Sequence, residues 1–322
     1  MTIRPCNRRG PRRVYAVMLM VAGAAALTYS LRGSAFAPPF NLTEVAPGNF
    51  VHMGKHVTFE DPDTDDIANI GFIVGEKCVA IVDTGGSVRV GRALRDAVRE
   101  HTQVPICYVI NTHSHFDHHF GNVVFKDDNP RFVGHHKLPE ALGGDNAYVL
   151  EHFGRYLGEN PSNADIIPPG QTVDSTVELD LGGKTLRLTA YPTAHTYSDL
   201  SVLDVGTGTL WLGDLLFRER LPSFDGSVLG WLEVIGTLEQ EQGVKTVIPG
   251  HGPVGEDLKA ALGDEKRYME TMVGEVRAQI AEGKDIDHAV ETVGLSERDR
   301  WQLWDQQHKR NVSRTYTELE WE

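Results

Sequence analysis

The sequence contains few cysteines and fewer basic than acidic residues. Three cysteines in 322 residues are too few for a disulfide scaffold or a four-cysteine zinc module. Lys and Arg total 31 against 45 Asp and Glu, and the formal net charge of −14 disfavours a nucleic-acid partner, whose phosphates need a basic surface. The sequence also lacks a G-x-S-x-G elbow and a glycine-rich phosphate loop after a strand. We therefore expect neither a serine nucleophile of the esterase type nor a nucleotide site.

The N-terminus has the pattern of a secretory signal. Five arginines between Arg4 and Arg13 precede an apolar run from Val14 to Leu31, and small residues follow. We expect residues 1–37 to be removed on export, which places the folded part in the periplasm or otherwise outside the cytoplasm. An uncleaved membrane anchor is the alternative, because 18 apolar residues just span a bilayer. Without this segment, which holds six Arg and no acid, the charge is (31 − 6) − 45 = −20.

The rest of the chain alternates predicted strands and helices. Apolar runs bounded by turn residues predict strands, and apolar spacing of three and four residues predicts helices. Strands are expected at 40–52 (a pair), 69–86 (a hairpin), 104–111, 131–134, 176–181, 184–190, 200–205, 209–213 and 244–248, and helices at 87–101, 138–157 and 228–242. From residue 256 the pattern is wholly helical. We therefore predict an α/β catalytic domain over 38–255 and a helical extension over 256–322 packed on it.

One stretch concentrates the residue types that bind metals. Residues 111–122 read NTHSHFDHHFGN and hold four of the 14 histidines. His113 and His115 are two residues apart, so in an extended segment both point to the same side. Asp117 and His118 follow at the predicted start of a helix, where the chain turns toward a neighbouring point. Imidazole and carboxylate are natural ligands of zinc, so the stretch predicts a metal site.

Further ligands are expected at the ends of three predicted strands. His195 lies in YPTAHTYSDL, Asp214 in LWLGDLLF and His251 in VIPGHG. Each follows an apolar run and precedes a turn-rich loop, and open α/β sheets gather their sites at such an edge. Together with the histidine-rich stretch, these residues form a coherent ligand set.

The order of these motifs over about residues 40–255 resembles the metallo-β-lactamase superfamily. The resemblance implies a four-layer αββα sandwich with two zinc ions at one edge of the sheets, iron or manganese being the alternatives. The implied ligands are His113, His115 and His195 at one metal, Asp117, His118 and His251 at the other, and Asp214 as the bridge. Asp83, in IVDTGG, fits the carboxylate that braces the ligand loop.

A narrower resemblance is to the exported quinoprotein relay system zinc metallohydrolases and the related SoxH-type proteins. The matching stretches are DIANIGFIVGEKCVAIVDTGGS, FVGHHKLPEAL, GDLLFRERLPSFDGSVLGWL and HKRNVSRTYTELEWE, of which the last lies beyond the superfamily core. The third ligand motif carries Asp214, as in thioesterases of the glyoxalase II type. The antibiotic-degrading members lack an Asp bridge there, which lowers the expectation of efficient β-lactam hydrolysis.

The ligand set supports a hydrolytic mechanism. Two metals about 3.5–4 Å apart share a bridging water whose pKa falls toward neutrality, and the resulting hydroxide is the nucleophile. Asp117 orients that hydroxide, and one metal polarises the carbonyl of an ester, thioester or related small acyl substrate. Three alternatives stay open: β-lactamase activity, oxidation of sulfur species at one iron held by His113, His195 and Asp214, and a non-catalytic accessory role in a periplasmic oxidation pathway.

Other polar residues receive lesser assignments. His56, in an acidic loop that can overhang the site, and Arg218 and Arg220, just after the third ligand motif, are the candidates for substrate contact. His119 is expected on a helix surface, with a position that supports a metal ligand as the alternative. The acidic residues at 61–66 are expected in a solvated loop.

Two cysteines lie outside the signal segment. Cys78 lies five residues before Asp83 and Cys107 six before His113, and the implied fold makes their strands parallel neighbours. If Asp83 is level with Thr112, the two cysteines are level too, with their Cα atoms within about 5 Å. Level residues on parallel strands meet disulfide geometry poorly, so we expect two reduced thiols that pack as small apolar groups.

Export can be tested on the protein itself. We expect protein from a cell-envelope fraction to begin between Phe36 and Phe40, because basic, apolar and small residues follow one another in the order of a cleaved signal. N-terminal sequencing measures the processed end. An intact Met1 on protein from the cytoplasm would contradict the prediction.

Overall fold

Two β-sheets form the centre of the structure, a computed structural model that describes residues 40–143 and 146–321. The strands of the first sheet lie in the order β1 (Thr43–Ala46), β2 (Asn49–His52), β3 (Ile70–Val74), β4 (Val79–Val82), β5 (Ile106–Ile110), β6 (Arg131–His135) and β7 (Gln171–Val173). Those of the second sheet lie in the order β12 (Thr246–His251), β11 (Thr209–Phe217), β10 (Leu200–Asp204), β9 (Thr185–Ala190) and β8 (Thr176–Asp180). Strands β4 to β7 run parallel, as do β11 and β12.

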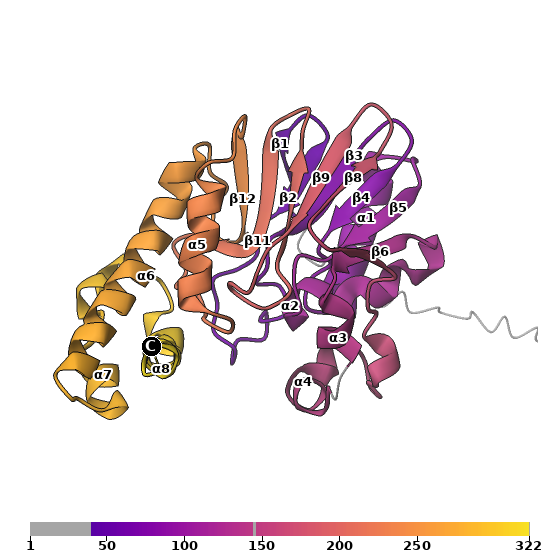
Figure 1. Cartoon of the computed structure of the whole chain (residues 1–322). Helices are drawn as coiled ribbons and strands as arrows, with labels where there is room; N and C mark the ends of the chain where they lie inside the picture. Colours follow the sequence, from indigo (N-terminus) through magenta and orange to yellow (C-terminus); the bar gives the residue numbers. More distant parts are fainter. Residues whose placement is uncertain (1–39, 144–145, 322) are drawn as a thin grey trace, which may run out of the picture. The chain divides into compact units, whose positions relative to one another are not determined.

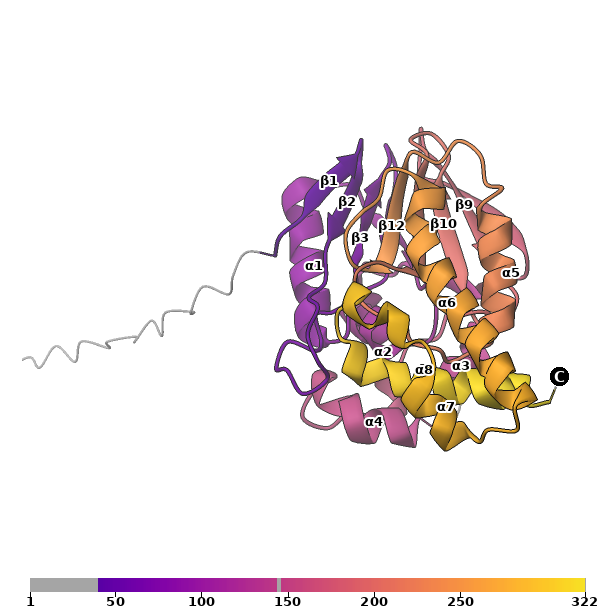
Figure 2. The same ribbon diagram turned by 90° about the vertical axis from the view of Figure 1, so that its left-hand side faces the viewer.

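Helices cover the outer face of each sheet (Figures 1 and 2). Helix α1 (Val88–His101) packs on the first sheet, and α5 (Val228–Leu238) and α6 (Leu258–Ala281) pack on the second. Apolar side chains from both sheets, among them Val82 and Trp211, fill the space between them. This four-layer αββα arrangement confirms the predicted fold class.

Strand β4 shows how the sequence produces these layers. Its residues are all buried, as expected of a strand with an apolar layer on each side. Val79 and Ile81 join the cluster beneath α1, while Ala80 and Val82 join the cluster between the sheets, because side chains alternate along a strand. Ser87 then caps α1 by accepting a hydrogen bond from a backbone N–H of its first turn.

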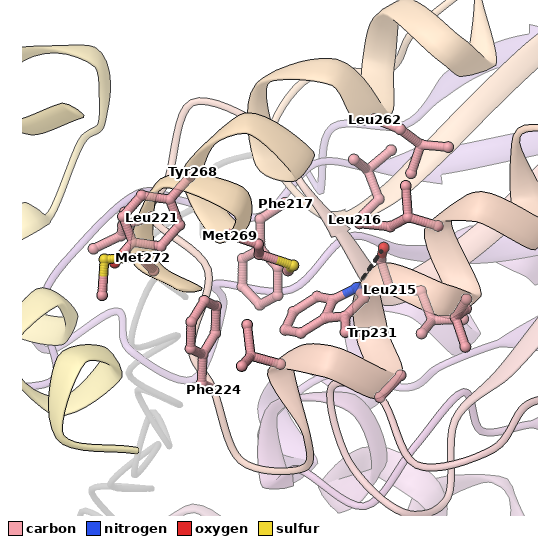
Figure 3. Close-up of a cluster of buried hydrophobic side chains, with 14 of the residues drawn as sticks. Leu215, Leu216, Phe217, Leu221, Phe224, Trp231, Leu262, Tyr268, Met269 and Met272 are labelled. Carbon is pink, nitrogen blue, oxygen red and sulfur yellow. Dashed lines mark hydrogen bonds between the residues drawn. The ribbon is translucent and has the colours of Figure 1, made fainter. Parts of the chain in front are cut away.

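The C-terminal helices share a core with the second sheet. Helices α7 (Ile286–Thr292) and α8 (Trp304–Leu319) follow α6, and α8 crosses the lower end of the sheets in Figure 2. Figure 3 shows Phe217 of β11, Trp231 of α5 and Tyr268 of α6 in one buried cluster. The Trp231 indole donates to the Leu215 backbone oxygen at 3.3 Å. The chain after residue 256 is therefore packed against the sandwich.

Short helices lie with α8 at the lower end of the sheets (Figures 1 and 2). They are α2 (Phe116–His119), α3 (Leu138–Gly143) and α4 (Ala147–Phe153). The single helix expected over 138–157 is wrong, since α3 ends at Gly143 and α4 begins at Ala147. Gly143 is the last residue of α3, as expected of a poor helix former. The expected signal segment lies outside the described residues, and no described helix is long and apolar enough to cross a bilayer.

The two cysteines are close, as expected, but they form a disulfide. Cys78 and Cys107 are bonded, with their Cα atoms 5.5 Å apart, so the expectation of two free thiols is wrong. Val79 pairs with Ile106, whereas the residue after Val79 pairs with Tyr108. Cys107 is the extra residue at this bulge. It is therefore not a level partner of Cys78, and the geometric objection to a bond does not apply.

Replacing both cysteines, Cys78→Ser with Cys107→Ser, is expected to lower the free energy of unfolding by roughly 3 kcal/mol, because a bond across 29 residues restricts the unfolded chain. Denaturant titration of the wild type and the double variant measures the difference. Labelling of denatured, never-reduced protein that lacks the signal segment should find no reactive thiol. Two reactive thiols would show that the bond does not form.

Candidate metal centre

All seven predicted ligands gather at one end of the two sheets. They come from the β5–α2 segment, from the loop between β9 and β10, and from β11 and β12. Their ligand atoms fall into two groups, and within each group the atoms lie within 4.8 Å of one another. The groups are His113, His115, His195 and Asp214, and Asp117, His118 and His251.

In the first group, three imidazoles face a common point. The Nδ1 atom of His115 lies 3.1 Å from Nε2 of His113 and 3.0 Å from Nε2 of His195. The Oδ2 atom of Asp214 lies 3.3 Å from Nε2 of His195. These side chains are buried except for His115, which is half-buried and lines a cavity.

Each of the five imidazoles is anchored through its outer ring nitrogen. An outer nitrogen that donates a hydrogen bond leaves the inner nitrogen with a free lone pair, which is the form that binds a metal. The outer nitrogens and their acceptors are His113 Nδ1 with Thr112 Oγ1 (3.0 Å), His115 Nε2 with Asp225 Oδ2 (3.0 Å), His118 Nδ1 with Asp83 Oδ2 (2.8 Å), His195 Nδ1 with Ser223 O (2.9 Å) and His251 Nδ1 with Ile67 O (2.7 Å).

Asp83 holds ligands of both groups. Its Oδ1 accepts from the backbone N–H of Thr112 at 2.8 Å, and its Oδ2 accepts from the Thr112 hydroxyl at 2.8 Å. The same Oδ2 accepts from His118. Since the Thr112 hydroxyl in turn accepts from His113, one buried carboxylate orients two imidazoles. This is the bracing position that the resemblance implied for Asp83.

Asp214 lies between the two groups. Its Oδ1 is 3.0 Å from Nε2 of His118, and its Oδ2 is 3.3 Å from Nε2 of His251. Oδ2 of Asp117 is 3.4 Å from that same nitrogen of His251. The buried Nε2 of His118 and Oδ1 of Asp214 make no hydrogen bond. Buried polar atoms that converge without a partner fit a bound cation.

The charge states of these groups also suit a metal. Burial lowers the pKa of His113 well below its usual value and lowers that of His195 to about 3. Burial alone would raise the pKa of Asp214, but the nearby His251 and His118 hold it well below its usual value. His113 and His195 are therefore neutral beside an ionised Asp214, which are the protonation states of metal ligands. Burial alone would lower the pKa of His115 and of His118, but Asp225 raises that of His115, and Asp214 and Asp117 raise that of His118. These two imidazoles release a proton when a metal binds.

Two glycines allow Asp214 to point into the site. The structure extends the expected strand 209–213 to Phe217, so Asp214 lies inside β11 rather than at its end. The β11–β12 register shifts at Gly213, whose φ of 52° lies in the left-handed region that favours glycine. A Cβ atom on Gly250 would collide with the Asp214 carboxylate. A side chain at position 250 would therefore displace the Asp214 carboxylate from its position in the site.

Sequence reasoning missed Asp225 and its partners on α8. The Asp225 carboxylate accepts from Nε2 of His115 and pairs with the guanidinium of Arg310. Arg310 also donates to the backbone oxygen of Phe224 at 3.2 Å, and Arg314 donates to that of Asp225. Burial would raise the pKa of Asp225, but His115 and Arg310 keep it well below its usual value. No motif marks Asp225, which lies in one of the stretches of the narrower resemblance.

A cavity of about 460 Å³ opens onto the ligands. Of the three candidates for substrate contact, Arg220 lines it, whereas His56 contacts Gln302 and Arg218 donates to two backbone oxygens at 253–254. Arg220 is 5% exposed and lies beside His251. Burial lowers its pKa, and it makes no ion pair with a described carboxylate.

Two other expectations are wrong. His119 is 2% exposed instead of lying on a helix surface, and its Nε2 bonds to the backbone oxygen of Ser114 at 3.1 Å. This contact fixes the backbone between two ligands, and burial lowers the pKa of His119 to about 4. In the acidic loop, Asp65 and Asp66 are buried rather than solvated. Asp65 pairs with Arg89, which gives its charge a partner.

Comparisons with known proteins agree with this geometry. The sequence profile of the family described as the metallo-beta-lactamase superfamily matches residues 63–255. A probable metallo-hydrolase of Methanocaldococcus jannaschii is 27% identical over 199 residues, which are 59% of this chain and 90% of that protein.

Solved structures share the fold. The sec-alkylsulfatase Pisa1 of Pseudomonas sp. matches with a TM-score of 0.67 at 16% identity over 87% of this chain and 50% of its own. The metallo-beta-lactamase of Pontibacter korlensis matches with a TM-score of 0.55 at 17% identity over 71% of this chain and 98% of its own. TMB-1 matches with a TM-score of 0.55 at 20% identity over 73% of this chain and 98% of its own.

Arg310→Ala is expected to weaken the binding of a divalent metal about tenfold, because Asp225 then loses the cation that fixes it against His115. Competition with a chromogenic chelator, using zinc as the probe, measures the affinity. Lys309→Ala is the matched control, since Lys309 is the preceding residue of α8 and pairs with Glu291 on the surface. Equal zinc affinity in all three proteins would contradict a role for α8 at the site.

Proposed function

Because the chain belongs to the metallo-beta-lactamase superfamily, we propose that it is a dinuclear, zinc-dependent hydrolase of an ester, thioester or related acyl substrate. The proposal rests on seven ligand atoms that converge in two groups with Asp214 between them. His115, Asp117 and His251 also line the cavity, so a molecule entering it meets the ligands directly. An accessory protein that only stored a metal would not need this opening.

The chain's own residues then have distinct tasks. The two groups of ligands would hold metal ions that lower the pKa of water toward neutrality and polarise a carbonyl oxygen, so no serine or cysteine nucleophile is needed. Asp117, at the start of α2, accepts a hydrogen bond from the attacking water and orients its lone pair toward the substrate. Asp214 is buried in the lining of the cavity, where its charge would offset that of the cations.

Arg220 binds an anionic group of the substrate in this proposal. A buried guanidinium needs a counter-charge, and no described carboxylate forms an ion pair with this one, although the charges of Asp117 and Asp214 act on it from a longer distance. A substrate carboxylate in the cavity supplies that counter-charge. The chain as a whole carries a net negative charge, which repels anionic molecules. Arg220 would attract the anionic group of the substrate locally, inside the cavity.

The two other reactions explain less of the site. Oxidation at a single iron uses His113, His195 and Asp214, and it leaves the group of Asp117, His118 and His251 without a task. The solved β-lactamases resemble this chain at 17–20% identity and share its fold. The carboxylate of Asp214 favours the thioesterase-like reaction over the β-lactamase reaction.

We also propose that the chain acts in the periplasm, cleaved from its N-terminal signal or tethered by it, on a small molecule. The basic and apolar N-terminal segment supports export. The stretch HKRNVSRTYTELEWE supports the narrower assignment to the quinoprotein relay and SoxH-type group. It forms most of α8 and reaches the site through Arg310.

We expect zinc-reconstituted protein to contain two metal ions per chain and to hydrolyse thioesters, and Asp117→Ala to lower kcat at least 100-fold because the water loses its orienting carboxylate. Elemental analysis and a thioester, lactone and β-lactam panel provide the measurements. Circular dichroism reports whether the variant is folded.

Asp96→Ala is the matched control, since it removes an exposed carboxylate of α1. A stoichiometry that never exceeds one would eliminate the dinuclear proposal. One iron per chain would favour sulfur oxidation, and turnover of β-lactams alone would favour the β-lactamase reaction. An Asp117→Ala protein with full metal content and near-wild-type kcat would refute the role of Asp117.

A further inference from the structure

We propose that the substrate carries a flat apolar group, such as phenyl, on the acyl side and close to the reacting carbonyl. This inference rests on the proposed acyl hydrolysis and names its substrate class. Its basis is a cavity whose lining includes two chemically different sets of side chains. We call them the apolar wall (Phe59, Phe116, Tyr148, Val149 and Phe153) and the polar wall (Arg220, Gln306, Gln307 and Arg310).

Helix α4 leaves apolar surface open to the cavity. Its sequence is AYVLEHF, yet none of its seven residues is fully buried. Val149 and Phe153 line the cavity, and Tyr148, at its rim, is 67% exposed. Phe59, from the loop between β2 and β3, comes within 6.3 Å of Phe153, measured between ring centroids. Exposed apolar side chains gathered around a cavity mark a binding surface.

The ring geometry favours a flat group over a flexible chain. Phe116 and Phe153 are stacked, with centroids 4.0 Å apart and planes 11° from parallel. Phe116 therefore covers one face of the Phe153 ring and fixes its orientation. What Phe153 offers to the cavity is its remaining ring surface, which another ring can contact in a stacked or edge-on arrangement.

The apolar wall begins next to a ligand. Phe116 and Asp117 are consecutive residues of α2, and both line the cavity. If the reacting carbonyl is held at the metal ligands, the apolar wall is close enough to contact a group attached to that carbonyl by one or a few bonds. This arrangement suits an aryl or arylalkyl acyl group. The polar wall, with Gln306, Gln307 and Arg310 from α8, is the part of the lining that this inference leaves for the leaving group.

Three thioesters of N-acetylcysteamine test the inference on the zinc-loaded chain. Acetyl, octanoyl and phenylacetyl thioesters share one leaving group, and the last two share the number of acyl carbons. We expect kcat/KM for the phenylacetyl compound to exceed that for the acetyl compound about tenfold and to exceed that for octanoyl. Equal values for acetyl and phenylacetyl would overturn the apolar subsite. A higher value for octanoyl would overturn its preference for a flat group.

Variants of the apolar wall test whether its side chains cause the preference for the phenylacetyl thioester. Phe153→Ala and Phe59→Ala should each reduce the phenylacetyl-to-acetyl ratio several-fold, and Phe59 is a partly exposed loop residue whose removal spares the core. Trp321→Ala is the matched control, since it removes a ring that is 84% exposed and does not line the cavity. Unchanged ratios in both wall variants would overturn the assignment.

Binding separates this inference from the proposed reaction. Calorimetric titration of the zinc-loaded chain with acetate, octanoate and phenylacetate needs no turnover. Selective binding of phenylacetate without hydrolysis of any thioester would support the subsite and contradict acyl hydrolysis. Hydrolysis without selectivity, and equal binding of the three carboxylates, would retain the reaction and overturn the subsite.

Discussion

The site depends on holding five imidazoles with their inner lone pairs directed at two points. A buried histidine can rotate or change tautomer unless its outer nitrogen is fixed, and each outer nitrogen here has its own acceptor. Asp83 contributes most, since it fixes His118 directly and His113 through Thr112. Strands β4 and β5 pair in parallel within the first sheet, so their ends lie side by side. Asp83 after β4 can therefore reach Thr112 and His118 after β5.

The C-terminal helices belong to the same arrangement. Helix α8 supplies Arg310 to Asp225, and Asn311 bonds to the backbone of Phe224 and Pro222 at 3.0 and 2.7 Å. Glu318 accepts from the backbone N–H of Val228 at 2.8 Å. Two stretches of the narrower resemblance, GDLLFRERLPSFDGSVLGWL and HKRNVSRTYTELEWE, are therefore in direct contact. The second stretch supports a loop that carries a partner of a ligand, which ties a segment outside 63–255 to the chemistry.

Local patterns failed where a long-range contact decided the outcome. His119 sits on a short helix and its position predicts a surface residue, yet the surrounding fold leaves it 2% exposed. Asp65 lies in an acidic run that reads as solvated, yet Arg89 compensates its charge. The disulfide depends on a bulge that shifts the register by one residue, and hydropathy does not encode such a shift.

The sequence by itself determined the alternation of strands and helices and the seven candidate ligands at strand ends, and its resemblance to a known superfamily implied the αββα layers. Strand periodicity, strand ends and the HSHFDHH spacing are local properties, and each follows from backbone geometry. The tertiary structure alone decided that Asp225 and Arg310 hold His115, that Arg220 rather than His56 or Arg218 lines the cavity, and that one wall of the cavity is aromatic. These relations join side chains dozens to hundreds of positions apart. Only packing sets such distances, because no local pattern specifies which surfaces meet.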